Sequence, residues 1–294
     1  MKSLQNKVAI ITGGGRGIGR ELALAFSREG AQVVIGSRTS KELDLTLSQI
    51  KSEGGVGIGI PTDVTKTEDV DYLVNTSVKT FKGIDILINA AGIQGPIGLL
   101  HENSIDAWIK TIHINLIGTF LSIRAVLPYL IKEKKGKIIN FSGGGATAPR
   151  PNFTAYSASK AAVVRLTETV AEEVQTFNIQ VNAVAPGIVG TKMLENILSF
   201  PEKAGKREVE AARLALDKKE TPQKAVNLAL FLASAKSDGI TGKLLSAVYD
   251  DWERWDPNCI KNIQKSDLYT LRRLDSYTLE KIEPYLGLIE ENGL

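Results

Sequence analysis

Residues 8–26 read VAIITGGGRGIGRELALAF, and this stretch contains the pattern that decides the fold. Its first part, Val8–Thr12, has the length of a strand and is apolar on both faces. A glycine-rich segment follows, and the residues from Arg20 to Phe26 continue with the spacing of an amphipathic helix. Strands buried on both faces belong to parallel sheets with helices packed above and below. The stretch therefore predicts one strand and one helix of a parallel α/β sheet.

Further apolar runs of strand length recur along the chain, each followed by amphipathic sequence of helix length. The candidate strands are Val8–Thr12, Gln32–Gly36, Gly57–Thr62, Ile84–Asn89, Gly136–Ser142, Ile179–Ala185 and Lys243–Val248. This alternation predicts the α/β class, with a Rossmann-type, doubly wound parallel sheet of about seven strands flanked by helices. Such sheets bind ligands at the carboxyl ends of their strands, where the strand order reverses.

Composition excludes several kinds of partner. The chain of 294 residues has a formal net charge of +3, and no basic run stands out as a nucleic-acid footprint. One cysteine and two histidines are too few for an internal disulfide or a histidine-based metal centre. No apolar stretch approaches the roughly 20 residues of a membrane span, and the N-terminus lacks a signal-peptide core. We expect a cytoplasmic protein without a metal, nucleic-acid or membrane partner.

The segment 250–294 differs in composition from the rest of the chain. It has ten acidic and six basic residues, so its net charge is −4 and the remainder carries +7. It also contains Trp252 and Trp255, and disordered tails are poor in aromatic residues. We predict one domain over 1–249 and an aromatic-rich, acidic extension over 250–294 that packs on the body or on a neighbouring subunit.

The glycine-rich segment after the first strand meets the physical requirements of a dinucleotide loop. Glycine permits a tight turn and a close approach of the backbone, and the helix N-terminus presents free N–H groups to a pyrophosphate. A plain glycine-rich turn would look similar, but the position between a buried strand and a helix favours a cofactor. The candidate contacts are Gly13, Gly15, Arg16, Gly17, Ile18 and Gly19.

The end of the second strand bears on the choice of dinucleotide. An acid there usually holds the ribose 2′-hydroxyl of NAD, whereas an arginine suits a 2′-phosphate. Here the strand runs into Ser37 and Arg38, and no acid occurs before Glu42. Arg16 could be a second cation on the same phosphate. The sequence therefore favours NADP(H), and NAD(H) is the alternative.

Tyr156 and Lys160 lie four residues apart in a helical run, which places them on one helix face. A phenol with an ordinary pKa of about 10 is a poor base at neutral pH. A nearby ammonium favours the phenolate and lowers that pKa, which would make Tyr156 usable as a general acid/base. Taken alone, a tyrosine and a lysine at this spacing are common on surface helices, so other motifs must support the interpretation.

Those motifs are present, in one order and spacing. They are Thr12-Gly13-x3-Gly17-x-Gly19, Asp63, Asn89-Ala90-Ala91-Gly92, Asn115, Tyr156-x3-Lys160, and Pro186-Gly187 with Thr191. In this combination the chain resembles the short-chain dehydrogenase/reductase family over residues 6–248. The resemblance implies hydride transfer between NAD(P)(H) and a carbonyl or secondary alcohol of a small to medium organic substrate. It also implies assembly as a homo-dimer or homo-tetramer.

The resemblance implies roles for the matching residues. Tyr156 would protonate the carbonyl oxygen, and Lys160 would hold the nicotinamide ribose and lower the Tyr156 pKa. Asn115 would anchor a water that links Lys160 to bulk solvent. Further contacts to the cofactor would come from Asp63, Val64, Asn89, Ala90, Gly92, Pro186, Gly187, Ile188 and Thr191.

One position departs from the family pattern. The family's catalytic serine lies 13 residues before the tyrosine, where this chain has Gly143. Side chains alternate along a strand, so Ser142 would point the wrong way unless the following glycines form a bulge that re-aims it. Either Ser142 partly supplies the substrate-polarising hydroxyl, or a substrate group or a water replaces it.

Two segments bear on substrate choice. Residues 192–221 occupy the place where the family varies most, and their apolar side chains suggest a pocket wall or a plain packing helix. The extension could close the substrate cleft or build a subunit contact, and analogy with the family slightly favours the cleft.

Three functions stay open at this point. An NADP(H)-dependent oxidoreductase is the leading interpretation, and an NAD-dependent alcohol or polyol dehydrogenase is its close variant. The third is a dinucleotide-binding regulatory or scaffold protein with weakened catalysis, which Gly143 supports and the intact Tyr156, Lys160 and Asn115 oppose.

Overall fold

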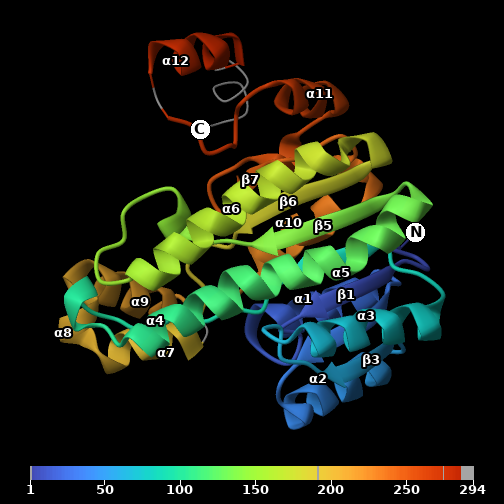
Figure 1. The fold of residues 1–294 in the computed structure, drawn as a ribbon, viewed down its shortest axis with the longest axis horizontal. Helices are drawn as coiled ribbons and strands as arrows, with labels where there is room; N and C mark the ends of the chain where they lie inside the picture. The colour runs from blue at the N-terminus through green and yellow to red at the C-terminus, as the bar shows by residue number, and fades with distance from the viewer. Residues whose placement is uncertain (1, 191, 274, 286–294) are drawn as a thin grey trace.

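The computed structural model describes residues 2–190, 192–273 and 275–285. Seven parallel strands form one sheet in the order β3-β2-β1-β4-β5-β6-β7 (Figure 1). Their bounds are β1 Val8–Thr12, β2 Gln32–Ser37, β3 Val56–Pro61, β4 Ile86–Asn89, β5 Gly136–Phe141, β6 Ile179–Ala185 and β7 Leu244–Ser246. The doubly wound parallel sheet expected from the sequence is confirmed, and each observed strand overlaps a predicted one.

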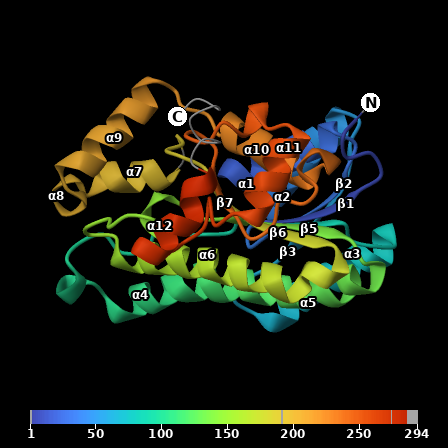
Figure 2. The same ribbon diagram turned by 90° about the horizontal axis from the view of Figure 1, so that it is seen from above.

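Helices cover both faces of the sheet, and the layers are seen edge-on in Figure 2. One face carries α1 Gly17–Arg28, α2 Ser40–Ser52 and α10 Gln223–Ala233. The other carries α3 Thr67–Phe81, α5 Gly118–Glu133 and α6 Thr154–Val174. The remaining α-helices of the described residues are α4 Ile105–Ile112, α7 Lys192–Ser199, α8 Pro201–Ala204, α9 Lys206–Asp217, α11 Pro257–Lys265 and α12 Ser276–Ile282.

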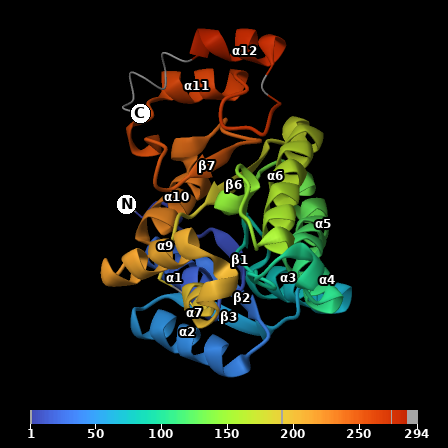
Figure 3. The same ribbon diagram turned by 90° about the vertical axis from the view of Figure 1, so that its left-hand side faces the viewer.

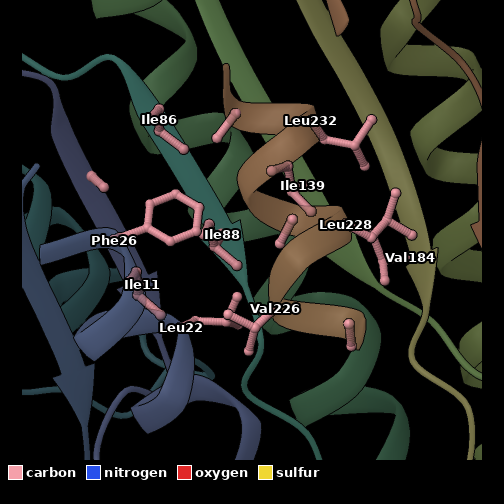
Figure 4. Close-up of a cluster of buried hydrophobic side chains, with 14 of the residues drawn as sticks. Ile11, Leu22, Phe26, Ile86, Ile88, Ile139, Val184, Val226, Leu228 and Leu232 are labelled. Atoms are coloured by element: carbon pink, nitrogen blue, oxygen red, sulfur yellow. The ribbon is translucent and has the colours of Figure 1, made fainter. Parts of the chain in front are cut away.

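The pairing register explains why both faces of the sheet are apolar. Ile10 is level with Val34 on one side and with Leu87 on the other, and all three belong to the cluster beneath α3, α5 and α6. The next residue, Ile11, points to the opposite face, where it packs with Phe26 of α1 (Figure 4). Because successive side chains alternate, each continuous apolar strand supplies both cores.

The strand order reverses at β1, which pairs with β2 on one side and with β4 on the other. The chain leaves these two neighbours toward opposite faces of the sheet. The loops that follow the strands therefore separate and leave a crevice at the carboxyl edge, the usual place for a ligand in this architecture.

One helix contradicts the expectation that no apolar stretch is long enough to span a membrane. Helix α4, a five-residue π-helical segment at His113–Ile117 and α5 form a continuous helix over Ile105–Glu133. Its most apolar part has a mean hydropathy of 1.6, so by length and composition it could cross a membrane. Half of that part is buried inside the fold, as packing of α5 on the sheet requires.

The extension packs at the β7 end of the sheet, as Figures 1 and 3 show. Trp252 and Trp255 are buried against Phe231 of α10, with ring centres 5.5 Å and 6.5 Å away. Trp255 also lies 5.3 Å from the ring of Tyr269. These aromatic contacts join the extension to the core on the α1 and α10 face of the sheet.

Hydrogen bonds also join the extension to the β7 edge of the sheet. The N–H of Leu244 donates to the carbonyl of Tyr269 at 2.7 Å, so main chain of the extension bonds to the edge strand. The buried ammonium of Lys243 donates to the carbonyls of Ser266 and Leu268, at 2.5 Å and 3.1 Å. Burial lowers the pKa of Lys243 to about 8. The extension thus covers an edge that would otherwise expose unpaired backbone groups.

Trp255→Ala should destabilise the fold by about 3–5 kcal/mol, because it removes a buried indole from between two aromatic rings. Urea unfolding measures this loss. Tyr249→Ala is the control, since Tyr249 is 73% exposed and its truncation should change the free energy of unfolding by less than about 0.5 kcal/mol. If Trp255→Ala also changes the free energy of unfolding by less than about 0.5 kcal/mol, the aromatic contacts of the extension do not stabilise the fold.

Candidate active site

A cavity of about 500 Å³ opens at the carboxyl ends of β1 to β4. Its lining includes many residues expected from the sequence, namely Gly13, Arg16, Gly17, Ile18, Gly19, Ser37, Arg38, Asp63, Val64, Ala90 and Gly92. It also includes residues that the sequence argument missed, namely Gly36, Thr39, Glu42, Thr62, Ala91, Ile93, Ile114, Gly190, Lys192 and Met193. Thr39, Thr62 and Ala91 lie within two residues after a strand end, and this position is the signal that could have found them.

Several expected cofactor contacts lie away from this cavity wall. Within the described residues the lining does not include Gly15, Asn89, Tyr156, Lys160, Pro186, Gly187 or Ile188. Asn89 is buried between strands, where its amide donates to the side chain of Asn140 at 2.9 Å. Thr191 lies outside the described residues.

Two glycines of the loop are required by close approach. Gly13 has a φ of +74°, and a Cβ there would lie 2.8 Å from the backbone nitrogen of Ala91. A Cβ on Gly19 would collide with the carbonyl of Gly13. The loop after β1 therefore packs against the loop after β4 and against its own helix, which aims the N-terminus of α1 at the cavity.

Two arginines line the cavity near the end of β2, and they differ in their ion pairing. Arg38 is exposed and forms no ion pair within the described part of the chain. Among the groups that lower the pKa of Asp63, against the effect of burial, is the positive charge of Arg38. Arg16 lies 3.4 Å from the carboxylate of Glu42, so this guanidinium is already paired and is not the free second cation that the sequence suggested. The buried hydroxyl of Ser37 has no hydrogen-bond partner among the described residues. A donor without a partner beside an arginine outside any ion pair suits an anionic ligand group.

Tyr156 and Lys160 lie on α6 and are both buried, with 8% and 6% of their surfaces exposed. The Lys160 ammonium donates to the carbonyl of Phe141 at 2.7 Å and lies 5.8 Å from the centre of the Tyr156 ring. Burial lowers the pKa of Lys160 to about 8. The lysine therefore lies within electrostatic range of the phenol, on the side that faces the end of β5.

The pKa of Tyr156 moves in the direction opposite to the one expected. Burial raises the pKa of the phenol, and the nearby positive charge of Arg150 opposes that rise. The cause is the cover formed by α7 and α9, whose Leu194 and Val209 belong to the same buried cluster as Tyr156. In this arrangement the phenol holds its proton at neutral pH, which suits a proton donor.

Asn115 sits in the π-helical segment and is completely buried. Its amide accepts from the N–H of Ile93 at 2.8 Å and donates to the carbonyl of the same residue at 2.9 Å. It also donates to the hydroxyl of Ser159, which in turn donates to the carbonyl of Tyr156. Asn115 thus connects the loop after β4 to the helix that carries Tyr156. π-helical segments inside α-helices occur frequently at functional sites.

The position expected to hold a serine faces the phenol. A Cβ built on Gly143 would lie 2.6 Å from the Tyr156 hydroxyl. Ser142 points elsewhere, because its hydroxyl donates to the carbonyl of Lys160 at 3.1 Å. Its N–H still bonds to Val184 of β6, so the strand pairing continues without a bulge that would re-aim the side chain. The structure therefore contradicts the suggestion that the Ser142 hydroxyl reaches the reaction centre.

Helices α7 to α9 cover the phenol. Leu194 and Ile197 of α7 are buried in the cluster that includes Tyr156, whereas Phe200 is 54% exposed. The apolar side chains of this segment therefore pack on the site rather than forming only a solvent-facing helix. No described residue of the extension lines the cavity, and its role in closing a substrate cleft stays a prediction. The extension lies at the other end of the sheet (Figure 3).

Sequence reasoning missed two charged side chains beside Tyr156 and one buried amide in the loop after β4. Arg150 stacks over its ring, with the guanidinium carbon 5.4 Å from the ring centre. Glu208 of α9 pairs with Arg150 at 2.6 Å. Gln94 is buried in the loop after β4. An arginine between two prolines, six residues before the tyrosine, was a visible signal, but its acidic partner is 58 residues away.

Comparison with known proteins agrees with this geometry. The family model described as short chain dehydrogenase matches residues 7–202. A 3-oxoacyl-(acyl-carrier-protein) reductase of Thermotoga maritima is 36% identical over 242 residues, which are 82% of this chain and 96% of that protein. A solved NAD⁺-bound xylitol dehydrogenase has a TM-score of 0.78 at 28% identity, covering 83% of this chain and 98% of the other.

A second solved structure, an actinorhodin polyketide ketoreductase with NADPH, has a TM-score of 0.76 at 27% identity. The match covers 82% of this chain and 95% of that one. The similar proteins thus include structures with either nicotinamide dinucleotide. The chain belongs to the short-chain dehydrogenase/reductase family and is an oxidoreductase that acts on CH–OH or C=O groups.

Proposed function

We propose that this protein is an NADP(H)-dependent reductase of a carbonyl group on a small to medium organic substrate, with Tyr156 as the proton donor. The observation that carries the proposal is the burial of Tyr156 together with the Lys160 ammonium, which lies 3.5 Å from where a Cβ on Gly92 in the cavity lining would be. The first test is whether the purified protein oxidises NADPH in the presence of a panel of aldehydes and ketones.

The residues fit a dinucleotide. The glycine loop aims a helix N-terminus at the cavity, where a pyrophosphate would bind. The Ser37 hydroxyl and the Arg38 guanidinium would hold a ribose 2′-phosphate. Asp63 and Val64 would lie against the adenine, and Lys160 would bond to the nicotinamide ribose. When bound, the nicotinamide supplies the hydride in reduction and accepts it in oxidation.

The chain's own groups would handle the proton. In reduction, the Tyr156 hydroxyl gives its proton to the substrate oxygen, and burial favours this protonated form beforehand. The phenolate that remains lies near the positive charges of Lys160 and Arg150, which lower the energy of the anion. Asn115 positions the Tyr156 helix against the loop after β4. Gly143 offers no hydroxyl, so a substrate group or a water polarises the carbonyl together with Tyr156.

Arg38→Leu should weaken NADPH binding about 10- to 100-fold and leave NADH binding within about twofold, because only NADPH carries the 2′-phosphate. Titrations monitored by energy transfer from tryptophan to the nicotinamide measure both affinities. Wild-type protein should prefer NADPH by at least about tenfold, or 1.4 kcal/mol. A wild-type preference for NADH would refute the NADP(H) proposal and leave the reductase proposal intact.

The alternative is an NAD(H)-dependent dehydrogenase of an alcohol or polyol, and one observation favours it. Glu42 lines the cavity and its carboxylate pairs with Arg16, so an acid is present near the end of β2. If Glu42 rather than Arg38 contacts the ribose, Glu42→Gln will weaken NADH binding more than NADPH binding. A regulatory or scaffold role would require cofactor binding without turnover of any carbonyl. A cytoplasmic homo-dimer or homo-tetramer stays a prediction from the family.

A further inference from the structure

The positively charged side chain of Arg150 lies beside the ring of Tyr156. It lies in the segment between β5 and α6, and its side chain is 20% exposed. The guanidinium carbon lies 4.1 Å from the centre of the Phe153 ring and 5.4 Å from that of Tyr156. Stacking on aromatic faces holds a guanidinium in place, and arginine stays charged at all ordinary pH values. A fixed cation therefore lies beside the phenol.

The counter-ion of Arg150 belongs to the cover of the site. Glu208 on α9 accepts from Arg150 at 2.6 Å, and its side chain is 22% exposed. A substrate must displace part of this cover to reach Tyr156, which is only 8% exposed. Movement of α9 would take Glu208 away and leave Arg150 partly desolvated without an anion, which is unfavourable. An entering substrate that carries its own anion would replace Glu208.

The loop after β4 offers a second unsatisfied group. Gln94 is 3% exposed, and neither atom of its amide has a hydrogen-bond partner among the residues described. This loop borders the site, because Ile97 packs against the cluster that holds Tyr156. The N–H of Gly98 donates to the carbonyl of Asn152, two residues after Arg150. Buried amides normally have partners, so a water or another polar group is expected beside Gln94.

We propose that Arg150 is a specificity-determining residue that binds a carboxylate of the substrate in place of Glu208. The substrates are then oxo acids, or hydroxy acids in the reverse direction. Glu208 shows that this position accommodates a carboxylate beside the guanidinium. The inference rests on the proposed function, because it names the substrate class of the same site.

The first experiment compares acids with their neutral counterparts. Wild-type protein and Arg150→Met are assayed with NADPH on 2-, 3- and 4-oxo acids and on the methyl ester of each acid. The wild type should prefer the best acid over its ester by about 100-fold in kcat/KM, and Arg150→Met should lose about 100-fold on that acid. The loss on the ester should be at least about tenfold smaller, because the ester loses only the stabilisation of the phenolate by Arg150 and no bond to an anion of its own. Equal losses on acid and ester would mean that Arg150 only holds the cover, and would overturn the proposal.

Glu208→Gln tests whether the Glu208 carboxylate competes with the substrate for Arg150 or only packs in the cover of the site. Removing the resident negative charge should lower KM for the acid and leave KM for the ester unchanged, because only the acid competes with Glu208. The matched control is Arg28→Met, which removes a similar ion pair to Glu53 on α1 and α2, with contacts of 2.7 Å and 2.8 Å. This control should leave the preference for acid over ester as in the wild type. A rise of KM for both substrates in Glu208→Gln would contradict the exchange of anions.

A binding measurement distinguishes failure of this inference from failure of the proposed function. Saturation-transfer NMR with butanoate and butanamide needs no turnover, and it is run with and without NADPH. The wild type should bind butanoate at least about tenfold more tightly than butanamide, and Arg150→Met should bind both alike. Arg150-dependent binding without turnover of any oxo acid would refute the reductase and keep the anion site. Equal butanoate binding by the two proteins would overturn the anion site.

Discussion

Tyr156→Phe should lower kcat for carbonyl reduction by about 10³-fold and leave the affinity for NADPH within about twofold of the wild type. The phenol is buried, and the ammonium of Lys160 lies 5.8 Å from the centre of its ring. The substitution keeps the ring and its packing against α7 and α9 but removes the proton donor. Single-turnover kinetics and a fluorescence titration with NADPH measure the two quantities separately.

The control for this prediction is another loss of a phenolic oxygen. Tyr249 is 73% exposed and lines no part of the cavity, so Tyr249→Phe should retain wild-type kinetics. If Tyr156→Phe keeps more than about a tenth of wild-type kcat, a different group protonates the substrate, since general acid catalysis contributes about 10²- to 10⁴-fold. A parallel loss of NADPH binding would instead indicate that the phenol positions the cofactor.

Gly143→Ser should lower kcat by about 100-fold, although it creates the residue that the family pattern leads one to expect. A Cβ at this position would lie 2.6 Å from the Tyr156 hydroxyl and 3.3 Å from two ring carbons. The phenol must therefore move, and a displacement of about 1 Å at a reacting group can cost about 10²-fold in rate. The same overpacking should destabilise the fold by about 1–3 kcal/mol.

The neighbouring glycine supplies a matched control. A Cβ on Gly144 meets nothing within 4 Å, so Gly144→Ser adds the same side chain to the same loop without a clash. This variant should keep kcat and the free energy of unfolding close to the wild-type values. Wild-type or higher kcat in Gly143→Ser would show that the phenol tolerates the shift, and that this site lacks only a hydroxyl.

Local sequence patterns were sufficient for the elements of the fold. Strands such as Val8–Thr12 were predicted with the observed bounds, because a doubly buried strand is a nearly continuous apolar run. The spacing of Tyr156 and Lys160 placed both on one helix face. Alternation along β5 also indicated that Ser142 points away from the phenol. Each of these inferences depends only on residues close together in the chain.

Contacts between distant segments could not be predicted in this way. Glu42 pairs with Arg16, which lies 26 residues earlier in the chain. Among the described residues, Arg38 rather than Arg16 is therefore the arginine outside an ion pair that could bind a phosphate. The Tyr156 pKa rises instead of falling, because α7 and α9 bury the phenol under a segment that the sequence left as a wall or a plain helix. Neither effect has a local signature.

The extension likewise combines a feature that the sequence predicts with one that depends on contacts between distant segments. Its aromatic composition indicated that it packs against something, but composition contains no direction in space. The extension packs at the β7 end of the sheet because its indoles contact α10 and its carbonyls accept hydrogen bonds from Lys243.

Periodicity and short spacings along the chain predict the order of strands and helices, the glycine loop and the tyrosine–lysine pair. The environment of the phenol comes from the packing of distant segments, which places Gly143 opposite its hydroxyl and the ion pair of Arg150 and Glu208 beside its ring. Burial and charge at one point depend on every segment that packs there, and those segments are far apart along the chain.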